Sequence, residues 1–217
     1  MRSRFDKQLD ELNKELIEMG ALCESAIAMA QKALKTGDAT LAAEIVSFDT
    51  EIDHKERSVE TMCLRMLLQQ QPVARDLRQI SAALKMITDM ERIGDQAADI
   101  AEMLKFVSGY KGEESQTISE MAKVTIEMVT KSIDAYVKQD VSLAKEVIGQ
   151  DDIVDKYFKR VKENLIELLS NKSLEGEYAI DLLMIAKYFE RIGDHATNIA
   201  EWVEFSVTGV HKGKVEL

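Results

Sequence analysis

Apolar residues recur at intervals of three and four along most of the chain. In the stretch from Phe5 to Leu34 they are Leu9, Leu12, Leu16, Met19, Leu22, Ala26 and Met29. Because an α-helix turns once every 3.6 residues, this spacing places the side chains on one helix face. Segments of this kind are too long and too rich in alanine for β-strands. The pattern therefore predicts long amphipathic helices.

Residues that interrupt helices divide the chain into six such segments. The interruptions fall around Gly37, at Pro72, at residues 109–112, at residues 138–140 and at residues 170–173. Glycine, proline and short polar clusters at these places are typical of turns between helices. We therefore expect an all-α protein whose consecutive helices run antiparallel.

The two halves of the chain repeat one pattern. AEIVSFDTEID ends at Asp53, and KEVIGQDDIVD ends at Asp155, 102 residues later. The segment ERIGD begins at Glu91 and again at Glu190, 99 residues later. The difference indicates a connection three residues shorter between the last two helices of the second half. The sequence predicts two tandem antiparallel three-helix bundles related by an internal repeat.

The interruptions also predict the boundaries of these units. We place the first bundle at residues 1–108, a linker at 109–114, the second bundle at 115–208 and a polar tail at 209–217. His211 lies in this tail, and we expect it to be disordered.

Charge and composition exclude several classes of protein. The net charge of −11 argues against binding along a nucleic-acid backbone, which requires an excess of Lys and Arg. The chain shows neither a stretch long and apolar enough to span a membrane nor the apolar segment of a signal peptide. Cys23 and Cys63 are far apart in apolar surroundings, as expected of reduced core residues in a cytoplasmic protein.

The acids of the repeated segment lie on one helix face. At 100° per residue, Glu91 and Asp95 are separated by about 40°, so they project to the same side one turn apart. The preceding helix carries Asp49 and Asp53 at the same spacing. In an antiparallel pair, residues at the same level have a constant sum of residue numbers. The pairs Asp49 with Asp95 and Asp53 with Glu91 share one sum, which places the turn at Pro72.

The second half gives the same result independently. Asp151 with Asp194 and Asp155 with Glu190 also share one sum, which places the turn near residues 172 and 173. Four carboxylates gathered at one level repel one another unless a cation lies among them. Oxygen ligands suit Mg, Mn, Ca or Fe, so we expect divalent or trivalent ions, with Fe, Mn, Mg or Zn as candidates. The predicted ligands are Asp49, Asp53, Glu91, Asp95, Asp151, Asp155, Glu190 and Asp194. Gly94 and Gly193 would allow the paired helices to approach closely.

Alternative interpretations remain open at this point. The acids can instead form a solvated face, or Arg92 and Arg191 can neutralise acids on a neighbouring helix. The Glu51-to-His54 spacing matches the Glu-x-x-His element of diiron proteins, but it occurs once. His195 is expected at the surface. No nucleophile with a neighbouring base is recognisable, so we do not expect an enzyme.

The chain resembles the PhoU family of bacterial phosphate-uptake regulators over nearly its whole length. The most specific matches are the segments ERIGDQAADIAE and ERIGDHATNIAE. The family signature is a duplicated E(D)-x-x-x-D in tandem three-helix bundles, matched by Glu91 with Asp95 and Glu190 with Asp194. Asn198 stands where the first copy has Asp99, which weakens a ligand role for that position.

The resemblance implies a cytoplasmic, often dimeric protein that binds metal clusters on its acidic surface. It implies negative regulation of phosphate uptake and of phosphate-starvation signalling when phosphate is plentiful. The implied partners are the ATPase subunit of the phosphate ABC transporter and a membrane sensor histidine kinase, so contact with the membrane would be indirect. A carboxylate-bridged oxidase or a metal-storage protein is the alternative.

Overall fold

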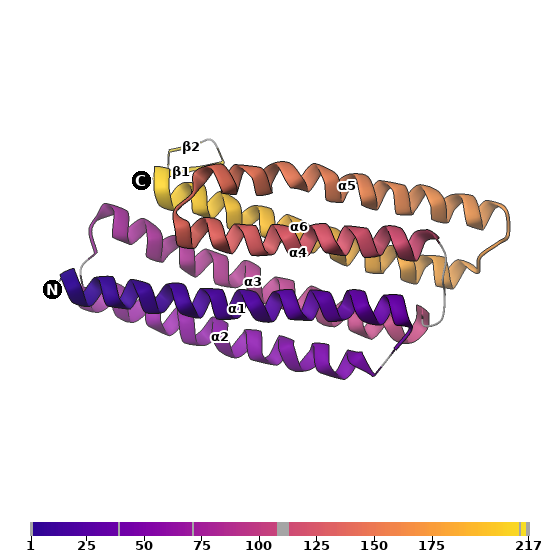
Figure 1. Cartoon of the computed structure of the whole chain (residues 1–217), viewed down its shortest axis with the longest axis horizontal. Helices are drawn as coiled ribbons and strands as arrows, with labels where there is room; N and C mark the ends of the chain where they lie inside the picture. Colours follow the sequence, from indigo (N-terminus) through magenta and orange to yellow (C-terminus); the bar gives the residue numbers. More distant parts are fainter. Residues whose placement is uncertain (1, 39, 71, 108–112, 213, 216–217) are drawn as a thin grey trace.

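Long helices fill the segments between the interruptions seen in the sequence (Figure 1). A computed structural model describes residues 2–38, 40–70, 72–107, 113–212 and 214–215, and within these ranges it contains six α-helices and one β-hairpin. The helices are α1 (Arg2–Thr36), α2 (Leu41–Gln70), α3 (Ala74–Val107), α4 (Glu113–Lys138), α5 (Val141–Ser170) and α6 (Gly176–Thr208). The hairpin pairs β1 (Val210–His211) with β2 (Lys214–Val215) in antiparallel fashion. The all-α prediction is confirmed. No helix of the described ranges is long and apolar enough to cross a membrane.

Local chemistry explains several helix ends. Gly37 and Gly209 follow α1 and α6 with φ angles of 70° and 76°, in the left-handed region that glycine adopts without a steric penalty. Before α5, the Asp140 carboxylate accepts hydrogen bonds from the backbone N–H groups of Ser142 and Leu143 at 2.9 and 3.1 Å. This satisfies two donors that have no partner within the helix.

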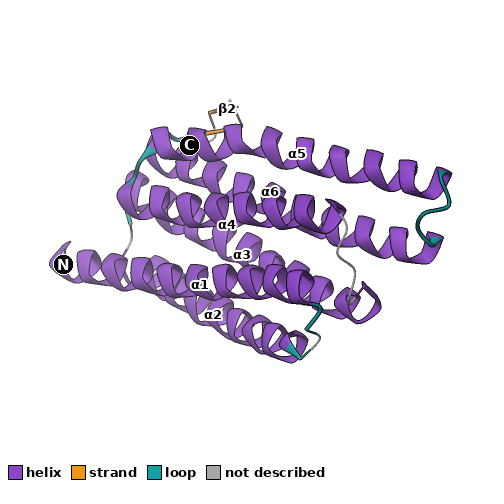
Figure 2. Cartoon of the chain, turned by 45° about the vertical axis from the view of Figure 1, so that its right-hand side comes forward, coloured by secondary structure: helices purple, strands orange, loops and turns teal. Residues whose placement is uncertain are grey.

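The two three-helix bundles share one core. In Figures 1 and 2, α1 and α4 form one layer, α3 and α6 form the layer behind it, and α2 and α5 lie at the two outer edges. Contacts between α3 and α6 and between α1 and α4 join the halves, and buried apolar residues of all six helices belong to a single cluster. Cys23 and Cys63 are buried in it, as predicted.

A pseudo-two-fold axis relates the halves. Helices α3 and α6 run in opposite directions (Figure 1). Across their seam Asn198 of α6 donates a hydrogen bond to Asp89 of α3, and the pKa of Tyr188 of α6 is raised by burial and then by the charge of Asp99 of α3. Under the 99-residue repeat these two interactions exchange, since Asp89 corresponds to Tyr188 and Asp99 to Asn198. Such an exchange is the mark of two-fold packing.

The predicted boundaries need two adjustments. Of the expected linker at 109–114, residues 109–112 lie outside the described ranges, and residues 113 and 114 already belong to α4. The expectation that His211 is disordered is wrong. Its ring stacks on Trp202 at a centroid distance of 3.9 Å, and Lys212 beside it pairs with Glu201 at 3.0 Å, so the hairpin is held against α6.

Candidate functional site

The structure brings the four acids of the first half together on the α2–α3 pair. Asp49 is half-buried, and its Oδ1 is fully buried with no hydrogen-bond partner among the described atoms. Burial raises the pKa of the Asp49 carboxyl, and the charges of Asp95 and Asp53 raise it further. Burial and then Asp95 likewise raise the pKa of Glu91, with Asp53 contributing, whereas Arg92 lowers it. Each acid therefore lies in the field of the others.

Gly94 makes this close approach possible. A Cβ atom at Gly94 would lie 3.0 Å from Ile52 Cδ1 and 3.1 Å from Asp49 Oδ1. Gly193 occupies the equivalent place in the second half, where a Cβ atom would lie 3.2 Å from Val154 Cγ1. The predicted role of both glycines is confirmed.

The second cluster repeats the arrangement on the α5–α6 pair. Burial raises the pKa of Asp151, and Asp194 and Asp155 raise it further, whereas the nearby Thr197 hydroxyl lowers it. Burial and then Glu190 raise the pKa of Asp194, with Asp155 adding to the effect and Lys187 opposing it. Asp155 and Asp194 are more exposed than their counterparts in the first half, whereas the Glu190 side chain, at 14%, is less exposed than that of Glu91, at 20%.

Basic side chains already neutralise part of each cluster, and in the second cluster Lys187 pairs with Glu190 on its own helix. Arg92 pairs with Glu91 at 3.3 Å and with Asp95 at 2.7 Å, both on its own helix. Arg57 pairs with Asp53 at 3.3 Å. The ion pairs of Arg92 are thus made within α3, while its charge also lowers the pKa of Glu56 on the neighbouring helix α2. Arg191 does act across the seam, because its charge lowers the pKa of Asp99 on α3.

The types of donor atom in the clusters suit a cation, but their arrangement in this structure does not yet form a binding site. Carboxylate oxygens suit a hard cation, and a buried Asp49 Oδ1 without a partner is an atom that such a cation would satisfy. Within the described residues, however, no three His, Cys, Asp or Glu side chains are already arranged to hold one ion. A cation would have to draw the carboxylates together and displace Arg92 from Glu91 and Asp95.

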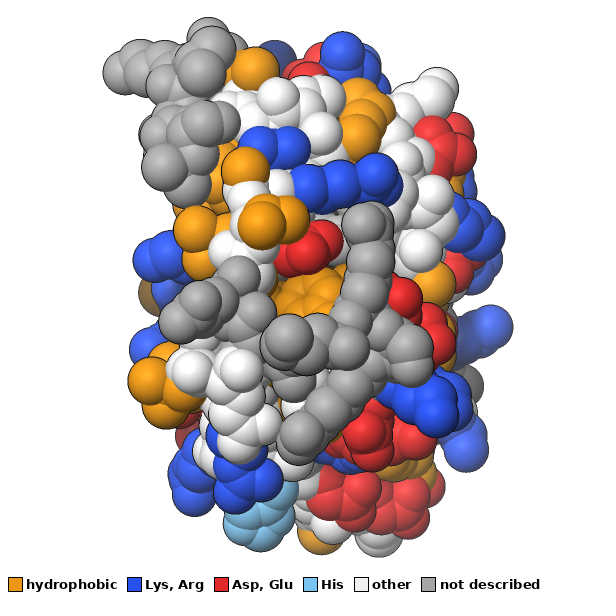
Figure 3. All heavy atoms as spheres, turned by 90° about the vertical axis from the view of Figure 1, so that its left-hand side faces the viewer, with side chains coloured by type: hydrophobic (Ala, Val, Ile, Leu, Met, Phe, Trp, Pro, Cys, Tyr) orange, Lys and Arg blue, Asp and Glu red, His pale blue; other side chains and the backbone are white. Residues whose placement is uncertain are grey.

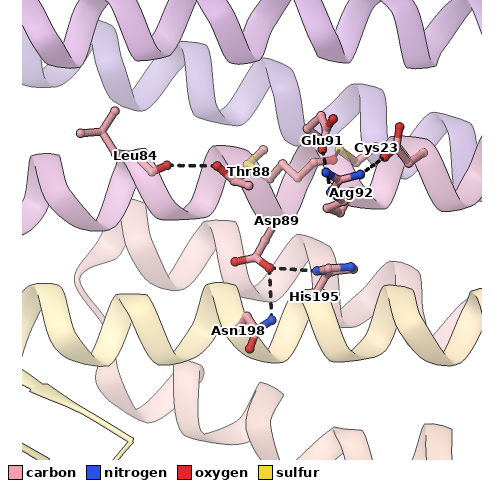
Figure 4. A network of polar contacts seen from close by, with 10 residues as sticks. Cys23, Leu84, Thr88, Asp89, Glu91, Arg92, His195 and Asn198 are labelled. Carbon is pink, nitrogen blue, oxygen red and sulfur yellow. Dashed lines mark hydrogen bonds and ion pairs between the residues drawn. The ribbon is translucent and has the colours of Figure 1, made fainter.

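His195 is not the surface residue that the sequence suggested. Its Nδ1 lies 2.9 Å from Asp89 Oδ1, which also accepts a hydrogen bond from Asn198 Nδ2 at 3.2 Å (Figure 4). The side chains of His195 and Asp89 are only 18% and 15% exposed. The contact joins α3 to α6 between residues 106 positions apart, so it is part of the seam between the halves.

Comparison with known proteins agrees with the repeat. Residues 16–104 and 118–203 each match the PhoU domain, and together they account for most of the chain. The chain belongs to the PhoU family. Among PhoU relatives, it is 36% identical over 210 residues to the phosphate-specific transport system accessory protein PhoU homolog of Clostridium acetobutylicum, covering 96% of each chain. It is also 36% identical over 206 residues to the homolog of Zymomonas mobilis, covering 94% of this chain and 87% of the relative.

Solved PhoU structures share the fold. The crystal structure of PhoU from Pseudomonas aeruginosa matches with a TM-score of 0.90 at 31% identity, covering 95% of this chain and all of the other. The phosphate transport system regulatory protein PhoU from Streptococcus pneumoniae matches with a TM-score of 0.87 at 25% identity, covering 95% and 98%. Two tandem three-helix bundles are thus the PhoU architecture.

Two further acids of this PhoU chain join the first cluster but were not among the predicted ligands. Burial raises the pKa of Glu56, and Glu60 and Asp53 raise it further. Burial and then Asp95 raise the pKa of Asp99. Both could have been found from the sequence, because Glu56 continues the face of Asp49 and Asp53, and Asp99 follows Asp95 by one turn.

Proposed function

We propose that this chain is a negative regulator of phosphate uptake and of phosphate-starvation signalling. Relatives named phosphate-specific transport system accessory proteins, and a structural neighbour named a phosphate transport system regulatory protein, support this role. In this proposal a cytoplasmic homodimer contacts the ATPase subunit of the phosphate ABC transporter and a sensor histidine kinase. It transmits the state of the transporter to the kinase and catalyses no reaction itself.

The proposed adaptor binds cations at its two carboxylate clusters. The observation that carries this step is the repetition of four acids at one level in both halves, with raised pKa values for Asp49, Glu91, Asp151 and Asp194. Mutual repulsion is relieved when a multivalent ion binds between the helices. Ions such as Fe, Mn, Mg or Zn would draw α2 towards α3 and α5 towards α6, and so define the surface that a partner contacts.

A matched pair of double variants tests this proposal. Asp49→Asn with Asp95→Asn removes two charges from the first cluster. Asp10→Asn with Asp134→Asn removes two charges from α1 and α4, where Asp10 is exposed and Asp134 is half-exposed and pairs with Lys138 on its own helix. After dialysis against limiting iron or manganese, elemental analysis should show less bound metal for the first variant alone. In cells grown in high phosphate, expression of phosphate-starvation genes should rise in the same variant and not in the control.

The result that would contradict the metal site is an equal metal content in both variants and the wild type. If metal is lost while gene expression stays repressed, the cation is structural and the regulatory step lies elsewhere. The oxidase or storage alternative gains no support from the described residues. His54, the histidine of the single Glu-x-x-His element, is exposed and lines a hollow with Glu15, Glu51 and Lys55, apart from both clusters.

A further inference from the structure

The internal repeat extends to exposed side chains that the core does not require. On α2, Asp53, Arg57 and Leu64 lie within about 40° of one another, so they form one stripe along the helix. On α5, Asp155, Lys159 and Ile166 form the equivalent stripe, each 102 residues later. Leu64 is 48% exposed and Ile166 is 56% exposed. Each repeat thus presents an acid, a base and an aliphatic side chain in the same order.

Other exposed positions of the same two helices have diverged. Glu60 corresponds to Lys162, and Arg65 corresponds to Glu167, so the charge reverses at both. Solvent-exposed positions tolerate such changes because they contribute little to stability. An exposed aliphatic residue at the same place in both halves therefore indicates a contact made outside this chain.

Each aliphatic residue belongs to a larger apolar patch near a hairpin tip. Near the α2–α3 turn, Leu64 is accompanied on the same helix edge by Leu68, which is 84% exposed. Near the α5–α6 turn, Ile166 lies level with Ile180, which is 62% exposed, across the antiparallel pair. Figure 3 faces the end of the bundle with the α2–α3 turn and shows hydrophobic side chains at the surface, with Lys and Arg side chains among them.

Leu64 and Ile166 are related by the pseudo-two-fold axis, whereas their neighbours Leu68 and Ile180 correspond under the repeat to Ser170 and Ser81. Helices α3 and α6 run in opposite directions, so the α2–α3 turn and the α5–α6 turn lie at opposite ends of the molecule (Figure 1). The axis passes near Gly94 and Gly193, which correspond under the repeat and lie at the middle of the seam. At 1.5 Å per helical residue, each patch lies about 20 Å from this axis, so the patches are about 40 Å apart.

We propose that the stripes of α2 and α5 are two equivalent docking sites for one homodimeric partner, whose two-fold axis coincides with the pseudo-two-fold axis of this chain. Each partner subunit inserts an apolar side chain at one hairpin tip. A single partner element cannot reach both patches, whereas a symmetric dimer presents the same element twice at a fixed separation.

The charges beside the patches define the chemistry of the partner. Arg57 and Lys159 precede the aliphatic residues on each stripe, and their side chains are 67% and 72% exposed. Their ion pairs with Asp53 and Glu163 are long, at 3.3 and 3.8 Å, and exposed pairs of this kind are weak and readily exchanged. The partner element therefore carries a carboxylate next to its apolar side chain. This inference rests on the proposed function, because the ATPase subunits of an ABC transporter work as a pair and so offer the required symmetry.

The experiment measures binding to the purified ATPase subunit of the phosphate transporter, held as a dimer with a non-hydrolysable ATP analogue. The variants are Leu64→Asp, Ile166→Asp and the double variant. The control is Ile17→Asp on α1, in the layer opposite α3 and α6, where Ile17 is 47% exposed and Leu64 is 48% exposed. Circular dichroism and urea unfolding establish that every variant is folded.

We expect each chain of the homodimer to bind one ATPase dimer. Either single variant should weaken binding about 100-fold, because the second contact of a bivalent complex is lost. The double variant should not bind, and Ile17→Asp should bind as the wild type does. If the wild type binds and the single variants bind equally well, the docking sites are refuted while the proposed function stands. If the wild type does not bind the dimer at all, both fail. If the substitutions leave ATPase binding intact but change the sedimentation of the chain itself, the stripes contact a second copy of this chain and the proposal is wrong.

Discussion

Replacing Gly94 with alanine tests whether close helix approach at the first acidic cluster depends on the missing side chain. An added Cβ atom would lie 3.0 Å from Ile52 Cδ1 and 3.1 Å from Asp49 Oδ1. Ile52 is fully buried, so its methyl group cannot swing into solvent. The substitution must therefore move α2 away from α3 or force both neighbours into poorer positions.

The magnitude follows from two opposing effects. Alanine stabilises a helix interior by about 1 kcal/mol relative to glycine. Overpacking a filled interior costs about 1–3 kcal/mol. Gly149 in α5 supplies the control, because among the described residues no atom beyond its chain neighbours and the adjoining helix backbone lies within 4 Å of a Cβ built there. Gly149→Ala should therefore show the propensity gain alone, and the two variants should differ in unfolding free energy by about 1–3 kcal/mol.

Urea unfolding followed by circular dichroism measures this difference directly. The experiment is done in the presence of a chelator, since a bound cation would add its own contribution to stability. Gly193→Ala, like Gly94→Ala, should have a lower unfolding free energy than Gly149→Ala, because Val154 is buried and its branched side chain is stiff. Equal stabilisation by Gly94→Ala and Gly149→Ala would refute the argument that the helices need glycine to approach.

Three further outcomes are expected. The pKa of Asp49 is higher in the folded protein than the value of 3.8 expected in the unfolded chain. The protonated carboxyl therefore stabilises the fold fully below pH 3.8, and this stability is lost as the pH rises through the pKa of the folded protein. In metal-free protein, Asp49→Asn should then raise the urea midpoint at about pH 7, and the gain should shrink towards about pH 4. Asp89→Ala leaves His195 without its hydrogen-bond partner and should lower the unfolding free energy by about 1–3 kcal/mol. Asp89→Asn should lower it less, and equal losses in the two variants would argue against the hydrogen bonds. Burial raises the pKa of Cys63 to about 12 and that of Cys23 still further, so a thiol reagent at neutral pH should label neither until urea unfolds the chain.

Local patterns predicted the helices and the levels of the acids, because these features depend on residues close in sequence. The apolar spacing of three and four located each helix, and Gly37, Pro72 and Asp140 marked real turns. The sums of residue numbers brought together the correct acids, because in an antiparallel hairpin the position of the turn fixes every level along the pair. Whether the acids bind a cation stays a prediction.

The features that the sequence did not predict depend on contacts between the halves. His195 was expected at the surface because its own helix gives it no partner, whereas Asp89 reaches it from 106 residues away. His211 was expected to be disordered because the tail is polar, but Trp202 offers its ring a stacking surface. Periodicity along one helix carries no information about which helix of the other half lies across the seam.

The antiparallel seam between α3 and α6 has a consequence for function. Tandem repeats that stack in the same direction present their equivalent surfaces side by side, and each copy can serve a separate partner. Here the exchange of the Asp89–Asn198 hydrogen bond and the Asp99–Tyr188 electrostatic interaction shows that the halves face each other about a two-fold axis. Equivalent acids, and the exposed aliphatic residues Leu64 and Ile166, then lie at equal distances from the two-fold axis. A single chain thereby acquires the symmetry of a dimer, and a symmetric partner can engage both halves at once. The differences beside the stripes, such as Lys162 in place of Glu60 and Glu167 in place of Arg65, would make the two engagements unequal and give the complex a direction.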